Sequence, residues 1–200
     1  MPRQNSSPAR ALDALNAEIR ACTRCSAQLP LGPRPVVRLH ADASLLIIGQ
    51  APGTKVHASG VPWDDASGER LRDWMAVDRE TFYDSTRIAI MPMGFCYPGR
   101  GNGGDLPPRP ECAPLWHERA LALLPRVRLT LLIGQYAQAR YLDARGLSLE
   151  ARVRDWRTHL ESGFLPLPHP SPRNTLWLKK RPWFEAEVVP ALRAELAKLG

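Results

Sequence analysis

Four cysteines stand in the chain as two pairs that are far apart in sequence. Cys22 and Cys25 form a Cys-x-x-Cys pair near the N-terminus, and Cys96 and Cys112 flank residues 97–111. Four thiolates are the ligand set of a tetrahedral zinc ion or of an iron–sulfur cluster. The pattern therefore indicates a metal centre that would tie the N-terminal segment to a distant loop.

Two disulfides, or cysteines scattered through the core, are the alternatives to a metal centre. The first ten residues are polar with no apolar segment behind them, and no apolar run approaches the roughly 18 residues that span a bilayer. We therefore expect a cytoplasmic protein, in a reducing compartment where Cys-x-x-Cys favours metal or redox chemistry.

Two loops bring further polar groups together. Residues 49–53 (Gly-Gln-Ala-Pro-Gly) allow backbone N–H groups to approach a ligand closely. Residues 169–174 (His-Pro-Ser-Pro-Arg-Asn) present an imidazole, a hydroxyl, a guanidinium and an amide on a segment stiffened by two prolines. An ordinary turn at 49–53 and a structural or solvated His169 are the simpler interpretations.

Short apolar segments must position these loops. Residues 45–48, 88–91 and 129–133 are continuously apolar and each precedes glycine or proline, as in parallel strands buried on both faces. Residues 164–167 form a weaker fourth strand because of their proline. In such a sheet ligands bind at the carboxyl ends of the strands, where both polar loops begin.

Helical patterns alternate with these strands. Ser7 and Pro8 predict the start of a helix that leads to Cys22. Further helices are predicted from Ser67 and over about residues 112–125, 135–144 and 183–198, while residues 98–110 read as an irregular glycine- and proline-rich loop. We expect one α/β domain over residues 1–200, with residues 1–7 flexible.

The charge balance favours a polyanionic partner. Lys and Arg number 27 against 20 Asp and Glu, which gives a formal net charge of +7. Lys179, Lys180 and Arg181 extend the basic character beyond the second loop, although such a run is as often only solvated.

Taken together, the two loop motifs and the cysteines resemble the uracil-DNA glycosylase superfamily, over roughly residues 10–195. The resemblance implies a three-layer α/β/α fold with a central, mostly parallel four-stranded sheet. The cysteine pattern, with Cys112 opening a helix, is similar to the iron–sulfur branch often called family 4. That likeness implies a 4Fe-4S cluster bound by Cys22, Cys25, Cys96 and Cys112.

Other features are similar to different branches. Gln50 stands where the iron–sulfur branch has glutamate, residues 169–174 resemble the single-strand-selective monofunctional branch, and residues 65–68 (Asp-Ala-Ser-Gly) resemble a branch whose aspartate is catalytic. The motifs are thus mixed between branches.

The resemblance implies roles for individual residues. His169 would hydrogen-bond the pyrimidine oxygen as negative charge builds there, and Asp65 would position water and stabilise a cationic sugar, with Asp64 as the alternative. A helix N-terminal charge is the simpler reading of that acidic pair.

Further residues would bind the base and the DNA. Trp63 would stack on the flipped base, with a plain core tryptophan as the alternative, and Arg173 stands at the wedge position. The expected base-binding residues are Gln50, Ala51, Trp63 and Gly94, and the expected DNA-binding residues are Ser171, Arg173 and Asn174.

One position departs from the iron–sulfur branch. The asparagine that reads uracil there, four residues before the third cysteine, is Pro92 in this chain. Proline has no amide side chain and no N–H, so discrimination would have to come from Gln50 or from backbone groups near Met93 and Gly94. Uracil, hypoxanthine, xanthine or another damaged base therefore remain alternative substrates.

The leading hypothesis is a monomeric, monofunctional glycosylase that removes uracil or another deaminated base from DNA in base excision repair. No lysine replaces a catalytic residue in either motif, so no lyase step is expected. A non-catalytic or weakly active protein that binds damaged or abasic DNA is the first alternative, and a zinc-stabilised nucleic-acid module is the second.

Overall fold

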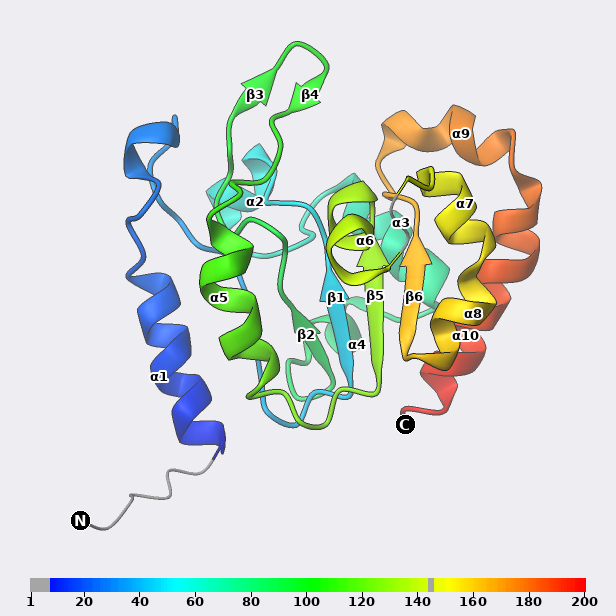
Figure 1. Ribbon diagram of the computed structural model, residues 1–200, viewed down its shortest axis with the longest axis horizontal. Helices are drawn as coiled ribbons and strands as arrows, with labels where there is room; N and C mark the ends of the chain where they lie inside the picture. Colours follow the sequence, from blue (N-terminus) through cyan, green and yellow to red (C-terminus); the bar gives the residue numbers. More distant parts are fainter. Residues whose placement is uncertain (1–7, 144–145) are drawn as a thin grey trace.

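The computed structural model describes residues 8–143 and 146–200, and its centre is a four-stranded parallel sheet (Figure 1). The strands are β1 (Leu45–Ile48), β2 (Ile88–Ile90), β5 (Leu129–Ile133) and β6 (Phe164–Leu167). They lie in the order β2-β1-β5-β6, and Leu45 pairs with both Ile88 and Leu129. All four predicted strands are confirmed, and the sheet is parallel throughout rather than mostly so.

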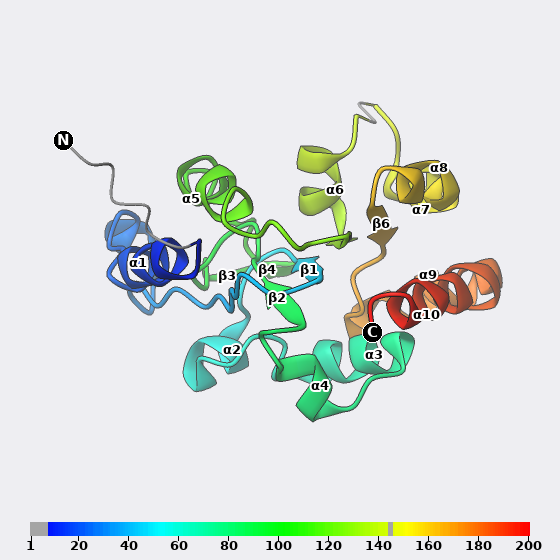
Figure 2. The ribbon, with the colours of Figure 1, turned by 90° about the horizontal axis from the view of Figure 1, so that it is seen from below.

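Helices cover both faces of this sheet (Figure 2). Strand residues alternate between the faces, because successive side chains of a strand point to opposite sides. Leu46 and Ile48 pack with α1 (Pro8–Arg20), α5 (Cys112–Leu121) and α6 (Gln135–Tyr141), whereas Leu45 and Ile47 belong to the opposite cluster. The predicted three-layer α/β/α architecture is therefore confirmed.

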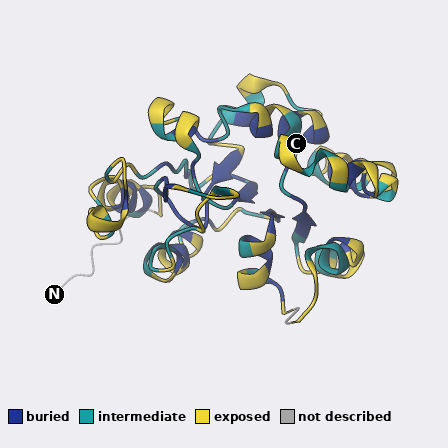
Figure 3. Cartoon of the chain, turned by 90° about the horizontal axis from the view of Figure 1, so that it is seen from above, coloured by how far each residue is buried: buried dark blue, intermediate teal, exposed yellow. Residues whose placement is uncertain are grey.

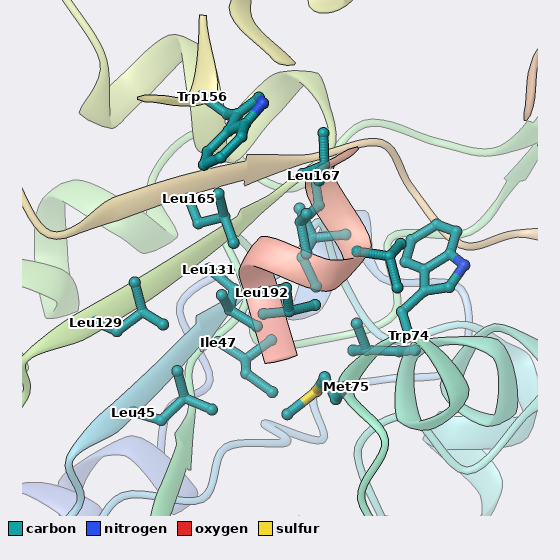
Figure 4. Packing of buried hydrophobic residues seen from close by; sticks show 14 of the residues in the cluster. Leu45, Ile47, Trp74, Met75, Leu129, Leu131, Trp156, Leu165, Leu167 and Leu192 are labelled. Atoms are coloured by element: carbon teal, nitrogen blue, oxygen red, sulfur yellow. The ribbon is translucent and has the colours of Figure 1, made fainter. Parts of the chain in front are cut away.

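The second cluster is the larger of the two and includes the C-terminal helix. Leu192 of α10 (Val189–Ala197) lies between the strand side chains and Trp74 and Met75 of α3 (Ala66–Met75), while Trp156 covers Leu165 at the far edge (Figure 4). The strands of the four-stranded sheet are buried on both faces (Figure 3), which explains their continuously apolar sequences.

Several short helices were not predicted from the sequence. They are α2 (Thr54–Ser59), α4 (Arg79–Tyr83), α7 (Leu149–Arg154), α8 (Trp156–Glu161) and α9 (Thr175–Lys179), together with 3₁₀ turns η1 (Ser26–Gln28) and η2 (Pro172–Asn174). Helices this short show too few turns for an apolar periodicity to stand out. Tertiary packing, rather than propensity, holds them.

The bounds of the predicted helices also shift. The helix expected over about 112–125 ends at Leu121, and that expected over about 135–144 ends at Tyr141. The helix expected near 183–198 forms as a π-helical turn, η3 (Phe184–Val188), followed by α10, which ends at Ala197. The expected start at Ser7 and the flexibility of residues 1–7 lie outside the described residues.

Residues 98–110 contain a small hairpin, so the prediction of an entirely irregular loop is wrong. β3 (Arg100–Gly101) pairs antiparallel with β4 (Gly104–Asp105). Leu106 N–H also donates to the carbonyl of Gly99 at 2.9 Å, which closes the base of the hairpin. The hairpin rises on the side of the sheet to which the strand arrows point (Figure 1).

None of the described helices is long and apolar enough to cross a membrane.

Candidate active site

A cavity of about 510 Å³ is lined by the segments that follow β1, β5 and β6. Residues before and at the start of α3 and residues 103–105 of the hairpin complete its wall. The chain leaves β1 toward β2 but leaves β5 toward β6 on the other side. The cavity therefore lies at the point where the strand order reverses, which is where open α/β sheets bind ligands.

Eight of the nine residues predicted for catalysis, base binding or DNA binding line this cavity. They are Gln50, Ala51, Trp63, Asp65, His169, Ser171, Arg173 and Asn174. Gly94 does not line it, because its N–H donates to the carbonyl of Gln50 at 2.9 Å and its Cα packs against Pro108. Its expected contact with a base is not supported by this placement.

Trp63 forms one wall of the cavity, and two glycines make room for it. A Cβ at Gly49 would lie 2.7 Å from Cζ2 of Trp63, and a Cβ at Gly68 would lie 1.8 Å from its carbonyl oxygen. Trp63 itself has a positive φ of 59°, which is strained for a bulky residue. Its indole is half-buried and lies 5.6 Å from the His169 ring, between centroids.

Asp65 is held by the start of α3. It is the N-cap residue, and its Oδ1 accepts the N–H of Gly68 at 2.9 Å. The structural interpretation of this carboxylate is therefore correct, but the same side chain also lines the cavity. Asp64 points elsewhere: its Oδ1 accepts from Arg79 at 2.7 Å, and it is absent from the cavity wall.

His169 is a neutral imidazole with a defined tautomer. Burial lowers the pKa of His169 below its ordinary value, against the opposing effect of the Asp65 charge. The N–H of Ser171 donates to Nδ1 of His169 at 3.2 Å. A ring nitrogen that accepts carries no proton, so the neutral ring carries its proton on Nε2 and can donate from there.

The loop after His169 is braced from two sides. Asn174 Nδ2 donates to the carbonyl of His169 at 2.8 Å, and Arg70 of α3 donates to the carbonyl of Ser171 at 3.2 Å. Arg173 reaches across the cavity mouth, where its Nη1 donates to the carbonyl of Gly103 at 2.9 Å. Arg173 thus fastens the hairpin to the loop that carries His169.

The basic run beyond this loop divides into two parts. Lys179 and Lys180 are exposed, whereas Arg181 packs over the Trp177 ring and pairs with Glu150. Within residues 179–181, Lys179 and Lys180 are therefore the solvated cations.

Among the cavity residues that sequence reasoning missed, three carry polar side chains that could contact a ligand: Gln135, Tyr136 and Asp105. Gln135 and Tyr136 follow β5 directly, and the rule that sites lie at carboxyl ends of strands could have found them. Asp105 lies on the hairpin, and no sequence signal distinguished it from other loop residues.

The four cysteines meet in a second, much smaller cavity of about 20 Å³. All four line it, and all four are free thiols, so they are gathered at one place rather than scattered through the core. Cys22 and Cys25 follow α1, whereas Cys96 precedes the hairpin and Cys112 opens α5. The sequence pairs thus converge, although no three His, Cys, Asp or Glu side chains in residues 8–143 and 146–200 are grouped as around one metal ion.

Local contacts surround these thiols. The N–H of Phe95 donates to Cys112 Sγ at 3.3 Å, and Cys25 Sγ lies 4.0 Å from Oε2 of Glu111. Burial raises the pKa of Cys96 to about 11 and of Cys112 to about 12. Both thiols are then protonated at neutral pH, and a bound metal would have to displace these protons.

The fold and this cavity define an α/β protein that can enclose a ring of the size of a nucleobase between an indole, a neutral imidazole and a carboxylate. Residues 37–193 match the family described as the uracil DNA glycosylase superfamily, and the chain belongs to that superfamily. Membership indicates a DNA glycosylase, a hydrolase of N-glycosyl bonds that acts on DNA in repair. Cys22 and Cys25 precede the matched residues.

Proposed function

We propose that this chain is a monofunctional DNA glycosylase that flips uracil or another deaminated base out of DNA and hydrolyses its N-glycosidic bond, in base excision repair. The observation that carries the proposal is the convergence of Trp63, Asp65 and His169 on one cavity, from segments more than a hundred residues apart. Each supplies a different part of the chemistry.

The departing base gains negative charge as the bond to C1′ of deoxyribose breaks. A neutral His169 with its proton on Nε2 can donate to an exocyclic oxygen of the base as that charge builds. The brace from Asn174 and the Ser171 N–H fixes the ring, so little reorganisation is needed during the reaction. Deaminated bases carry such an oxygen where the parent base has an amino group.

The sugar becomes cationic at the same time. Asp65 would stabilise that positive charge and position a water, while Oδ1 stays bound to the start of α3. Trp63 offers its half-buried indole for stacking with a base that has left the duplex, which offsets part of the lost stacking energy. Ser171, Arg173 and Asn174 would contact the DNA backbone beside this cavity.

This chain must recognise the base differently from the iron–sulfur branch, in which an asparagine amide contacts uracil at the position that Pro92 occupies here. Pro92 lines the cavity, but its carbonyl already accepts from Nε2 of His117 at 3.0 Å. Gln50 and Gln135 each carry an amide at the cavity wall and can pair with either a donor or an acceptor of a base. These amides support a preference for a deaminated base without choosing between pyrimidine and purine.

A lyase step is not part of the proposal. No lysine among residues 8–143 and 146–200 lines the cavity, and Lys55 lines only an adjoining groove. Without an amine at the reacting carbon, the product is an intact abasic strand. Borohydride should therefore trap no covalent adduct between the protein and abasic DNA.

We further propose that Cys22, Cys25, Cys96 and Cys112 bind a 4Fe-4S cluster. The support is that all four thiols line one small cavity. Each cysteine of such a cluster binds a different iron, so its ligands stand farther apart than those of a single zinc ion. The cluster would join the end of α1 to the start of α5 and would act as scaffold, because its cavity is separate from the one that holds His169.

The function is tested with oligonucleotides that contain uracil, hypoxanthine or xanthine, both single-stranded and duplex. Alkali-sensitive product is expected with at least one of them, and His169→Ala should slow its formation by about 10²- to 10⁴-fold. His40→Ala is the matched control, because His40 lies outside the cavity and should leave the rate unchanged. Binding of abasic DNA with no product across the whole panel would favour a non-catalytic damage-binding protein instead.

The cluster is tested on protein purified without oxygen. We expect a brown protein that absorbs near roughly 400 nm and contains iron and sulfide in equal amounts. Cys112→Ser should remove the colour, whereas His40→Ala should keep it. A colourless protein loaded with zinc would contradict the cluster and support the zinc alternative.

A further inference from the structure

Asp105 is a second carboxylate at the wall of the main cavity. It ends β4, and its side chain lines both this cavity and the adjoining groove of about 320 Å³. Oδ2 of Asp105 lies 3.4 Å from the point that a Cβ of Gly53 would occupy, so the carboxylate faces the loop after β1. Asp65 lines the same two spaces.

The hairpin that carries Asp105 is held in place at the cavity mouth. Arg173 donates to the carbonyl of Gly103, and a Cβ at Gly104 would fall 2.0 Å from Nη1 of Arg173. Gly104 also has a φ of +145°, which other residues rarely adopt. Gly104 thus allows the guanidinium to lie on the hairpin backbone, directly before Asp105.

The two carboxylates differ in their hydrogen bonds. Asp65 uses Oδ1 to cap α3. The side chain of Asp105 accepts no hydrogen bond from any residue in the described ranges 8–143 and 146–200, so both of its oxygens can accept from water. Asp105 is therefore the better placed of the two to take up a proton without loss of a structural contact.

The charges around Asp105 leave it able to change its protonation state. Asp105 is exposed, but partial desolvation raises its pKa and the nearby Asp65 charge raises it further, while Arg173 and Arg100 lower it. Tyr97 and Lys55 are the other titratable groups that line the groove with it. A carboxylate with a raised pKa is a stronger base than an ordinary surface aspartate.

We propose that Asp105 is a second catalytic residue of this site and acts as the general base for the attacking water. The inference rests on the glycosylase function proposed above. In the step, the water oxygen bonds to C1′ of the deoxyribose and one O–H bond of the water breaks, with its proton passing to Asp105. The C1′–N bond breaks and its electron pair leaves with the base, which is hydrogen-bonded by His169.

With two carboxylates, one can stabilise the cationic sugar while the other accepts the proton of the water, two tasks that a single carboxylate performs poorly together. The group that stabilises a cationic sugar must stay ionised, whereas the group that accepts the proton must become neutral in the same step. Asp65 is assigned the first role because its Oδ1 is held by the N–H of Gly68 at the start of α3, a contact that a proton-accepting role would disturb. Asp105 takes the second role and later returns the proton to the base or to solvent.

The test is the single-turnover rate of base release by Asp105→Asn, measured against pH on the best substrate of the panel. The variant keeps the shape of the side chain but cannot accept the proton, so we expect a loss of about 10²- to 10⁴-fold. The wild-type rate should fall as pH drops through the raised pKa of Asp105, and this acid limb should disappear in the variant. Asn102→Ala, at the exposed turn of the same hairpin, should keep both rate and limb.

A second measurement separates chemistry from placement of the hairpin. Affinity for abasic-site DNA should stay within a few-fold of wild type in Asp105→Asn. A loss of affinity as large as the loss of rate would show that Asp105 only positions the hairpin or the DNA, and would overturn the proposal. An active wild type with an unchanged Asp105→Asn profile overturns the role of Asp105 alone, whereas an inactive wild type overturns the glycosylase function with it.

Discussion

The indole of Trp63 lies directly against Gly49, where a Cβ would fall 2.7 Å from Cζ2 of the ring. The backbone of Trp63 is fixed in position, because Gly68 packs against its carbonyl oxygen and Arg72 donates to that oxygen at 3.3 Å. Gly49 therefore sets the position of the aromatic wall. Gly49 was expected to let backbone N–H groups approach a ligand. Its lack of a side chain also makes room for the Trp63 indole.

Gly49→Ala should destabilise the protein by about 1–3 kcal/mol, as overpacking does elsewhere. The cost should shrink when Trp63 is also replaced by alanine, because the clash is then removed. Urea unfolding of the two single variants and the double variant measures this coupling. Gly103→Ala is the matched control, since no atom lies within 4 Å of its Cβ position. Additive costs in the double variant would contradict the assigned contact.

Asp65 should show separable structural and chemical roles. Asp65→Asn keeps a side chain that can cap α3, so stability should change little while base release slows by orders of magnitude. Asp65→Ala should lose the same activity and, in addition, about 1 kcal/mol of stability. Thermal unfolding and single-turnover rates measure the two effects on the same samples.

Asp64→Asn provides the comparison for that pair of variants. Asp64 pairs with Arg79 outside the cavity, and this partner lowers the pKa of Asp64. The variant should therefore retain nearly the full rate. If it lost activity as Asp65→Asn does, the roles of the two aspartates would have to be exchanged.

His117 should make stability depend on pH. Its Nε2–H donates to the carbonyl of Pro92, so its Nδ1 accepts from the hydroxyl of Tyr141 at 2.6 Å, and burial lowers its pKa to about 4. Below the unfolded value near 6.5 the unfolded chain binds the proton more readily. The stability contributed by neutral His117 is thus complete above about pH 6.5 and is lost as pH falls toward about 4, by roughly 3 kcal/mol in all.

Urea unfolding across this pH range checks the prediction. His117→Phe should be less stable than wild type near neutral pH, because it leaves Pro92 and Tyr141 without their partner, but its stability should fall less on acidification. An imidazole of His117 that titrates close to 6.5 by NMR would argue against the burial described above.

Arg173→Lys should loosen the hairpin. A lysine ammonium has neither the length nor the fork of a guanidinium, so the bond to the carbonyl of Gly103 should be lost. Amide hydrogen exchange should then accelerate over residues 100–106, including the N–H of Leu106. Lys179→Ala, an exposed cation on α9, should leave this exchange unchanged. Equal protection in Arg173→Lys would mean that the strands alone hold the hairpin.

Much of the site could be predicted because its residues follow strands. The apolar runs at 45–48 and 164–167 must be buried on both faces, and parallel strands bring their carboxyl ends to one edge. The 49–53 and 169–174 loops were therefore expected at the same edge, and the strand order, with only β5 between β1 and β6, brings them to one cavity. The sequence constrained the meeting of the four cysteines less strongly, because that meeting depends on how α1 and α5 pack and not on strand pairing.

Other parts could not be predicted because they depend on packing between distant segments. The sequence made Asp65 the candidate and left Asp64 as the alternative, whereas in the fold Asp65 caps α3 and lines the cavity and Asp64 pairs with Arg79 outside it. Gly94 was expected at the base, yet its N–H is used by Gln50.

By itself the sequence determined the sheet, its layers and the two loops that carry Gln50 and His169, because burial of continuous apolar strands leaves few other arrangements. Only the tertiary structure decided which polar groups share the cavity. It turned a loop expected to be irregular into a hairpin, fastened it through Arg173, and placed Asp105 in the wall of the same cavity as Asp65. Such contacts join residues that no local periodicity relates, so they exist only once the chain has folded.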